Sequence, residues 1–559
     1  MRIRTTNKPG ISALIDQCAR HGMKHVVCSP GSRNAPLVIA IDQHPDIETI
    51  VIHDERSAAF YALGMAQALS APVGLVCTSG SALLNYYPAV AEAYYQEIPL
   101  VVLSADRPAE WVDHGDGQTI VQKGVYANHI RYQMTVSEHK CSEEDVSIAF
   151  NAALNEWVGP IHFNVPLTEP LYEIEEHDWE KKSSIDHLSA DFELTEEERI
   201  PFREAWISSP KKMILCGQMD FSSSLKNDLE ELSNDSSIAV LVENTSNLNG
   251  KHWVHCLDRT LAGITEEEIE EFQPDLLITI GGAIISKRIK QFLRASDIKF
   301  HWRIGYSFPE MDTYRALTNH FSAKPGQFLR EILKNDFPRN ESRFGSVWKQ
   351  RDFMIQENQK DFLTAVEYSD FAVFETLLDY LPEGCNVHMA NSSVVRYCQL
   401  FDPITSLRYF SNRGASGIDG STSTAAGISL IDSGKCNVLF TGDISFFYDS
   451  NALWNANLPA NLRIFLINNE GGGIFRIIDG PRKSEQLEKY FEAHHTQKAE
   501  FICKAHEVEY LKAHSISEIE RGLHNFFEED DRPKLMEIFT PRERNDEVLK
   551  AFFAAAASI

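Results

Sequence analysis

Two polar loops that each follow a short apolar run constrain the fold of this chain more than any other feature. The run Val438-Leu439-Phe440 leads into Gly442-Asp443-Ile444-Ser445, and the run Ile464-Phe465-Leu466-Ile467 leads into Asn468-Asn469-Glu470-Gly471-Gly472. Short apolar runs closed by polar residues and glycine are typical of buried strands that end in loops. Loops at the carboxyl ends of parallel strands meet at one edge of the sheet, where ligands bind. We therefore expect these two loops to lie side by side at that edge.

The residues in these loops are suited to a hard metal ion. Asp443 and Asn469 offer side-chain oxygen atoms, and the glycine-rich backbone at Gly471 can add a carbonyl. Magnesium binds a few protein oxygens together with substrate phosphates, so the pattern predicts Mg2+ (or Mn2+) carrying a diphosphate. The alternative is a pair of ordinary strand-end turns without a ligand. Gly-Asp-x-Ser followed at this spacing by Asn-Asn resembles the signature of thiamine diphosphate (ThDP) enzymes.

Composition and charge argue against several classes of protein. A hydrophobic content of 43% and a charged content of 24% are ordinary for a globular chain, and no stretch approaches the roughly 20 apolar residues of a membrane span. The formal net charge of -27 argues against nucleic acids and anionic membranes as partners. The N-terminus lacks a signal-peptide core, and the ten cysteines lack metal-ligand spacing. We expect a cytoplasmic protein with reduced core thiols.

The alternation of strand and helix signals predicts an α/β fold of three doubly wound parallel-sheet domains in series. The signals alternate through residues 1–180, 195–335 and 352–559, which is the rhythm of βαβ units. Polar stretches at Glu173–Glu198 and Asn335–Arg351 predict linkers between the domains. The predicted strands are Lys24–Cys28, Ile47–His53, Gly74–Thr78, Leu100–Ser104, Ile161–Val165, Lys212–Cys216, Ile238–Val242, Asp275–Ile280, Asn386–Met389, Asn437–Phe440, Arg463–Ile467 and Lys534–Phe539.

Glu55 is the candidate proton-transfer residue of the first segment. We expect it at the end of the second strand, just before a predicted helix from Ser57 to Leu69 that begins with small residues. A carboxylate that faces an apolar cleft has a raised pKa, which suits it to exchange protons. The alternative is a structural acid in a first helical turn, where the helix dipole favours negative charge.

Four further motifs resemble a single family of ThDP enzymes, the 2-succinyl-5-enolpyruvyl-6-hydroxy-3-cyclohexene-1-carboxylate (SEPHCHC) synthases of menaquinone biosynthesis. The similarity is dense in the first and third segments and thin in the middle one. The motifs are Ser29-Pro30-Gly31-Ser32-Arg33-Asn34-Ala35-Pro36-Leu37, His53-Asp54-Glu55-Arg56-Ser57-Ala58, Asn391-Ser392-Ser393-Val394-Val395-Arg396 and Ser411-Asn412-Arg413-Gly414-Ala415-Ser416-Gly417-Ile418-Asp419-Gly420.

The resemblance implies a transferase that joins two dicarboxylates. These synthases use ThDP and Mg2+ (or Mn2+) to decarboxylate 2-oxoglutarate, and they add the resulting succinyl-semialdehyde carbanion to isochorismate with release of CO2. The three segments would be the pyrimidine-binding, central and diphosphate-binding domains. Glu55 would contact N1′ of the cofactor's aminopyrimidine. The active sites would be shared between the subunits of a homodimer or dimer of dimers.

The resemblance also implies roles for individual residues, with Glu55 as the catalytic residue. The metal ligands would be Asp443, Asn469 and Gly471. The cofactor would contact Glu55, Ser392, Ile418, Gly442, Asp443, Ser445, Asn469, Gly471, Ile474 and Phe475. The substrates would contact Ser32, Arg33, Arg107, Gln118, Lys287, Arg288, Ser392, Arg396 and Arg413.

The basic residues of that set fit dicarboxylate substrates, because a planar guanidinium can hold a carboxylate through two hydrogen bonds. For Lys287, Arg288 and Arg396, a solvated surface charge is the alternative. Arg33 and Arg413 lie in glycine-containing loops at predicted strand ends, where functional residues are common.

Two other functions stay open on the sequence. One is a different ThDP enzyme that decarboxylates or ligates 2-oxo acids, although the middle segment lacks a GxGxxG motif for a dinucleotide. The other is a catalytically silent subunit with the same fold. Intact Glu55, Asp443 and Asn469 argue against that second alternative.

Overall fold

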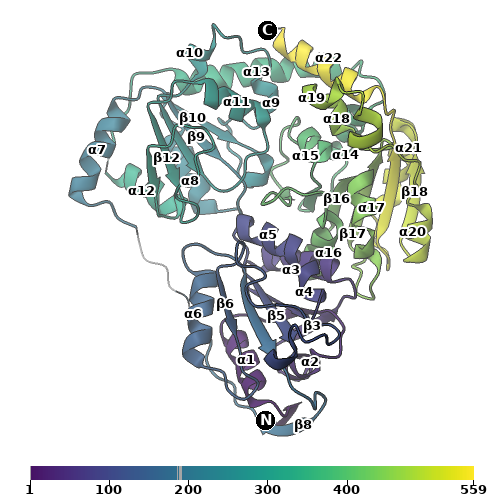
Figure 1. The fold of residues 1–559 in the computed structure, drawn as a ribbon. Coiled ribbons are helices and arrows are strands. Elements are labelled where there is room, and N and C mark those ends of the chain that lie inside the picture. Colours follow the sequence, from purple (N-terminus) through teal and green to yellow (C-terminus); the bar gives the residue numbers. More distant parts are fainter. Residues whose placement is uncertain (1, 186, 188–191, 336, 559) are drawn as a thin grey trace.

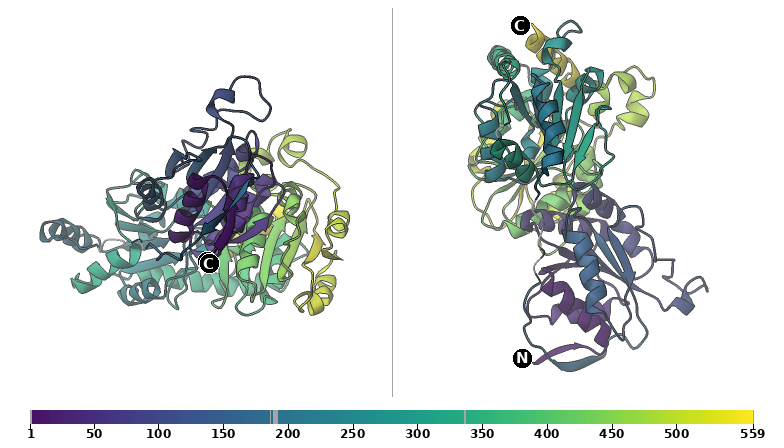
Figure 2. Two further views of the ribbon diagram at one scale, coloured as in Figure 1. Left: turned by 90° about the horizontal axis from the view of Figure 1, so that it is seen from below. Right: turned by 90° about the vertical axis from the view of Figure 1, so that its left-hand side faces the viewer.

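The chain is built around three parallel β-sheets that helices cover, and the computed structural model describes every residue except 1, 186, 188–191, 336 and 559 (Figure 1). The predicted α/β class with sheets in series is confirmed. The central and C-terminal sheets lie beside each other, and the domain that contains the N-terminus extends away from both of them, as the right-hand view of Figure 2 also shows.

The N-terminal domain holds a six-stranded parallel sheet with the order β3-β2-β4-β5-β7-β6. Its inner strands β2, β4, β5 and β7 are almost entirely buried, as parallel sheets covered on both faces require, whereas the edge strands β3 and β6 are partly exposed. The strands are β2 (His25–Cys28), β3 (Glu48–Val51), β4 (Val73–Cys77), β5 (Leu100–Asp106), β6 (Tyr132–Thr135) and β7 (Ile161–Pro166). The helices are α1 (Pro9–Arg20), α2 (Ala35–Asp42), α3 (Glu55–Leu69), α4 (Ala82–Asn85), α5 (Tyr87–Gln96) and α6 (Glu143–Leu154).

The central domain holds a five-stranded parallel sheet with the order β10-β9-β11-β12-β13. The chain leaves β9 on one side and later returns to its other side, so the switch point lies between β9 and β11. The strands are β9 (Lys212–Cys216), β10 (Ile238–Val242), β11 (Leu276–Ile280), β12 (Phe300–Ile304) and β13 (Asn319–Phe321). The helices are α7 (Glu196–Ile207), α8 (Ser223–Leu232), α9 (Leu257–Thr260), α10 (Ile269–Phe272), α11 (Lys287–Ala295), α12 (Pro325–Lys334) and α13 (Phe344–Leu363).

The C-terminal domain repeats the strand order of the N-terminal one, with β15-β14-β16-β17-β19-β18 in its six-stranded sheet. The strands are β14 (Asn386–Met389), β15 (Arg408–Phe410), β16 (Asn437–Gly442), β17 (Leu462–Asn468), β18 (Glu509–Ala513) and β19 (Lys534–Phe539). The helices are α14 (Asp370–Asp379), α15 (Ser393–Cys398), α16 (Ser421–Ile431), α17 (Asp443–Tyr448), α18 (Ile474–Ile477), α19 (Asp479–Arg482), α20 (Glu500–Ala505), α21 (Ile516–Phe526) and α22 (Asn545–Ala557).

Helices α3 and α16 join the two six-stranded domains through glycines. A Cβ at Gly64 would lie 2.1 Å from the carbonyl oxygen of Thr424, and one at Gly427 would lie 2.2 Å from that of Tyr61. Only glycine permits such close approach of two helix backbones. One hydrophobic core therefore runs from the first sheet through these helices into the third.

Two of the sequence expectations need correction. The stretch Glu173–Glu198 was expected to be a linker, but β8 (Ile174–Asp178) pairs antiparallel with β1 (Arg2–Thr6), and α7 begins within the stretch. Residues 186 and 188–191 of this stretch lie outside the described part. The stretch Asn335–Arg351 is also ordered in part, because α13 begins at Phe344. Polar composition hid both elements, since every residue of β8 is exposed and α13 buries only one face.

The cysteines and the helices bear on two further expectations. All ten cysteines are free, and eight of them are buried. The expectation of core thiols without disulfides is therefore confirmed. Within the described residues, every helix falls short of the length and apolar character needed to cross a membrane.

Candidate active site

The Asp443 and Asn469 loops lie side by side at the carboxyl edge of the third sheet. Strands β16 and β17 are neighbours, with Gly442 opposite Ile467. Asp443 is the first residue of α17 and is only 2% exposed. Its Oδ2 accepts a hydrogen bond of 2.8 Å from the backbone N–H of Gly471, and its Oδ1 accepts one of 2.7 Å from that of Ile444. The carboxylate is thus fixed between the two loops.

A buried carboxylate orients the Asn469 side chain. The Asn469 amide nitrogen donates to Asp370 Oδ2 at 3.0 Å, and the Thr540 hydroxyl donates to Asp370 Oδ1 at 2.6 Å. Burial raises the pKa of Asp370 to about 6, while these two hydrogen bonds lower it. Because the amide nitrogen faces Asp370, the carbonyl oxygen of Asn469 faces the other way. Asp443, Asn469 and the Gly471 backbone therefore present the hard oxygen donors that Mg2+ prefers.

His495 is a neighbour of Asp443 that the sequence analysis missed. Its Nε2 lies 3.4 Å from Asp443 Oδ2, and its ring packs edge-on against Phe447. The nearby Asp443 carboxylate raises the pKa of His495. The residue lies in an irregular segment after α19, where no periodic pattern or motif marks it.

The remaining predicted cofactor residues surround the same edge. The Ser445 hydroxyl donates to the carbonyl of Ile418 at 2.6 Å, and the Ile418 side chain is 37% exposed. Ile474 and Phe475 begin the short helix α18, where the Phe475 ring contacts that of Phe491. Ser392 precedes α15 with φ of 77°, a backbone conformation that is strained for a residue other than glycine and that often occurs at functional sites.

A cluster of positive charge lies near this edge. The Arg413 guanidinium donates to Asn391 Oδ1 at 2.6 Å. Burial lowers the pKa of Arg413, Glu243 raises it and Arg396 lowers it again. Burial and the charge of Arg396 also lower the pKa of Lys287. Three of the predicted substrate residues, Lys287, Arg396 and Arg413, therefore interact electrostatically.

The basic residues in the first turn of α11 have different neighbours. The Arg288 guanidinium lies 4.0 Å from the ring centre of Phe553 on α22. Lys290, one turn after Lys287, lines the same cavity as Arg413. Burial lowers its pKa, Glu243 raises it, and Arg413 and Arg396 lower it again. Sequence reasoning missed Lys290, although its i, i+3 spacing from Lys287 places both on one helix face.

A second group of predicted substrate residues lies on the first sheet. The guanidinium groups of Arg33 and Arg107 lie 5.5 and 5.6 Å from the ring centre of Trp111. Arg33 also donates to the carbonyl of Leu167 at 3.1 Å and to Glu169 at 3.2 Å. The two arginines therefore both contact the Trp111 ring, at the carboxyl ends of β2 and β5.

Ser32 and Gln118 lie on loops at the same edge. The Ser32 hydroxyl shares a 3.0 Å hydrogen bond with that of Tyr172. The backbone carbonyl of Gln118 accepts from the Ser79 hydroxyl at 3.0 Å, and the Gln118 side chain is exposed.

Glu55 begins α3, rather than ending the preceding strand as expected. Burial raises its pKa. Its neighbour Asp54 caps the helix by accepting from Ser57 N–H and also accepts from Asn451 at 2.7 Å. Arg56 donates to the carbonyl of Tyr448 at the end of α17. The start of α3 is therefore attached to the helix that Asp443 begins.

The predicted residues thus form two groups within one chain. In the part of the chain that the structure describes, no hydrogen bond or ion pair joins Arg33 or Arg107 to the cluster of Lys287, Arg396 and Arg413.

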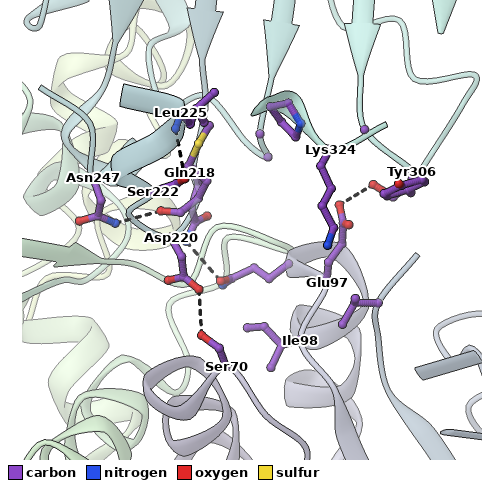
Figure 3. A pocket seen from close by; sticks show the side chains of 18 of the residues that line it. Ser70, Glu97, Ile98, Gln218, Asp220, Ser222, Leu225, Asn247, Tyr306 and Lys324 are labelled. Carbon is purple, nitrogen blue, oxygen red and sulfur yellow. Dashed lines mark hydrogen bonds between the residues drawn. The ribbon is translucent and has the colours of Figure 1, made fainter. Parts of the chain in front are cut away.

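A further cavity lies between the central and N-terminal domains. It measures about 810 Å³ and opens at the carboxyl ends of β9, β11 and β12 (Figure 3). Gln218, Asp220 and Ser222 line it from the central domain, and Ser70 and Glu97 face them from the first domain. Arg413 borders it, whereas Asp443, Asn469 and Glu55 do not. The cavity is therefore distinct from the cradle formed by the Asp443 and Asn469 loops.

Comparison with known proteins agrees with this geometry. The family model described as thiamine pyrophosphate enzyme, N-terminal TPP binding domain, matches residues 9–125. The model described as middle domain of thiamine pyrophosphate matches residues 177–387. Thiamine pyrophosphate is another name for ThDP, so two of the three domains match ThDP enzymes.

Several curated relatives match over almost the whole chain, and each is named 2-succinyl-5-enolpyruvyl-6-hydroxy-3-cyclohexene-1-carboxylate synthase. The relative from Flavobacterium johnsoniae is 42% identical over 97% of this chain and 98% of its own length. The relative from Christiangramia forsetii is 43% identical over 98% of this chain and 98% of its own length. The relative from Porphyromonas gingivalis is 38% identical over 98% of this chain and 97% of its own length. The chain therefore belongs to the SEPHCHC synthase family of ThDP-dependent enzymes.

Proposed function

We propose that this protein is a SEPHCHC synthase of menaquinone biosynthesis, which decarboxylates 2-oxoglutarate and joins the remaining four-carbon unit to isochorismate. The observation that carries the proposal is the cluster of Lys287, Arg396 and Arg413 at the carboxyl edge of the third sheet, where the Arg413 guanidinium donates to Asn391 Oδ1 just after β14. Both substrates are dicarboxylates, and a buried guanidinium is suited to bind a carboxylate through two hydrogen bonds. A net charge of -27 makes such local positive charge necessary for anionic substrates.

The proposal includes Mg2+, or Mn2+, as the ion that carries the cofactor's diphosphate. Asp443 and Asn469 would each supply one side-chain oxygen, and the backbone of Gly471 would supply a carbonyl oxygen. The Asp370–Asn469 hydrogen bond supports this role, since partners behind a ligand fix its orientation.

When bound, ThDP stabilises the negative charge that remains at the keto carbon after CO2 leaves. Glu55 would hold a proton at the aminopyrimidine, and its raised pKa suits it to that task. Ile418, Ile474 and Phe475 would give the site an apolar wall that excludes water. Arg413 and Arg396 would bind and orient the substrate carboxylates.

We further propose that each active site is shared between two copies of the chain. The separation of the predicted substrate residues into two groups supports this arrangement, since Arg33 and Arg107 would then face the Arg413 cluster of the partner. A two-fold axis would give a homodimer with two equivalent sites. A cytoplasmic location is proposed from the ten free cysteines, because thiols stay reduced in the cytosol.

Measurement of CO2 release from 2-oxoglutarate, with and without isochorismate, tests the function. A SEPHCHC synthase requires both substrates for sustained turnover and forms a product that contains both. Rapid CO2 release without isochorismate would indicate a 2-oxo acid decarboxylase instead. No release under either condition, with ThDP and Mg2+ bound, would indicate a catalytically silent subunit.

A further inference from the structure

The loop of residues 412–418 connects the cofactor edge with the positive cluster, since it contains both Arg413 and Ile418. Residues of its own domain hold its two ends. The Asn391 amide donates to the carbonyl of Asn412 at 2.7 Å and to that of Gly417 at 2.6 Å, and Ser445 binds the carbonyl of Ile418. These contacts leave the middle of the loop, Gly414 to Ser416, to be held from another domain.

A carboxylate from the N-terminal domain holds this middle part. Glu92 on α5 is 2% exposed. Its Oε1 accepts from the N–H of Gly414 at 2.6 Å, and its Oε2 accepts from those of Ala415 and Ser416 at 2.7 and 3.3 Å. Three consecutive backbone donors thus converge on one buried anion, in the manner of a backbone anion nest. Hydrogen bonds to an ionised acceptor are stronger than neutral ones.

The loop backbone is shaped for this contact. A Cβ at Gly414 would lie 2.4 Å from the carbonyl oxygen of Glu92 and 3.1 Å from its Oε1. Any side chain at position 414 would therefore push the loop away from α5. Gln96, one turn further along α5, also donates to Glu92 Oε1. The carboxylate is held from both sides.

The contact lies directly beside Arg413. Burial lowers the pKa of the Arg413 guanidinium. The negative charge of Glu243 raises it, the positive charge of Arg396 lowers it, and the negative charge of Glu92 raises it. Glu92 therefore affects both the backbone that carries Arg413 and the electrostatic environment of its side chain. Arg413 itself makes one side-chain hydrogen bond, to Asn391, within the described part of the chain, so its direction depends on the backbone around it.

We propose that Glu92 is a positioning residue that fixes the backbone of Gly414–Ser416 and thereby aims Arg413 at a substrate carboxylate. The proposal rests on the substrate role proposed above for Arg413. It predicts that loss of the Glu92 charge weakens substrate binding rather than cofactor binding.

Glu92→Gln tests the proposal, because glutamine has the same shape but replaces one acceptor oxygen with an amide donor. We expect KM for the dicarboxylate substrates to rise about 10-fold, the effect of weakening a hydrogen bond to a charged group. The affinity for ThDP with Mg2+ should change by less than about two-fold, since the Asp443 and Asn469 loops are untouched. Deuterium exchange at Gly414–Ser416 should become faster.

A matched control separates this role from general stability. Glu331 on α12 is a similarly buried carboxylate that accepts hydrogen bonds from Asn335 at 3.3 Å and from Lys334 at 3.4 Å, at a distance from the loop and from Arg33. Glu331→Gln should lower the melting temperature but leave KM unchanged. Gly414→Ala displaces the same contact from the loop side and should reproduce the KM increase. It therefore tests the proposal even if Glu92→Gln folds poorly.

Wild-type KM values in both Glu92→Gln and Gly414→Ala would overturn the proposal, and so would unchanged deuterium exchange at Gly414–Ser416. Failure of the proposed function would appear differently. In that case the wild-type enzyme itself would not use the two substrates, while the exchange rates of the loop would still respond to Glu92→Gln.

Discussion

The first and third sheets have the same strand order, yet their carboxyl edges carry different chemistry. The third sheet presents oxygen donors at Asp443 and Asn469, which suit a metal and a diphosphate. The first sheet presents Glu55 with a raised pKa and two arginines around Trp111. One topology therefore carries two different sets of side chains at its strand ends, because the loops there can change without disturbing the core.

The comparison predicts the largest effect for the third sheet. Asp443→Ala should abolish retention of ThDP and Mg2+, and with it activity, because no neutral ligand replaces a charged oxygen on a hard divalent ion. The protein should stay folded. Calorimetric titration with ThDP and Mg2+ is the measurement, with Asp379→Ala, an exposed position on α14, as the control. Near-normal affinity of Asp443→Ala for ThDP and Mg2+ would mean that Asp443 is not a metal ligand.

A smaller effect is expected for the acid of the first sheet. Glu55→Gln should keep cofactor binding but slow turnover by about 10²–10⁴-fold, the range for a general acid–base group. Exchange of the C2 proton of bound ThDP, followed by NMR, should slow in parallel. The exposed Glu48 on β3 offers a control, since Glu48→Gln should leave both rates unchanged. Unaltered C2 exchange in Glu55→Gln would contradict the assignment.

Arg413→Lys should have a third, more selective effect. Lysine keeps the charge but cannot bind a carboxylate through two parallel hydrogen bonds, so kcat/KM for the substrates should fall about 10- to 100-fold. Cofactor affinity should be nearly normal. Steady-state constants for both substrates test this expectation, and wild-type constants for each would exclude Arg413 from the substrate site.

The smallest expected loss of activity belongs to an experiment that tests whether the carboxyl edges of the first and third sheets meet across two subunits. A heterodimer of one Glu55→Gln chain and one Asp443→Ala chain would have one site with both lesions and one with neither, on the two-fold argument. Doubly tagged heterodimer, purified away from both homodimers, should recover about half of the wild-type activity. Activity as low as that of the parent homodimers would mean that each site is built within a single chain.

Neighbouring residues were enough to predict the elements and the chemistry that depend on local patterns. Apolar runs closed by Gly-Asp and by Asn-Asn specified β16 and β17 and placed Asp443 and Asn469 at a sheet edge. Such predictions succeed because strand propensity and loop residues act over a few positions. Where the pattern was polar, the same reasoning failed. Every residue of β8 is exposed and the start of α13 buries only one face, so neither segment shows a clear apolar pattern.

Residues that support the site from distant parts of the chain are recognisable only in the three-dimensional packing. Asp370 reaches Asn469, His495 reaches Asp443, and Glu92 reaches the loop of Arg413. Each of these residues carries an ordinary side chain in an unremarkable sequence context. Their roles arise from burial and from hydrogen bonds across the domain packing. Such contacts depend on how the sheets and helices pack in three dimensions, which no local pattern encodes.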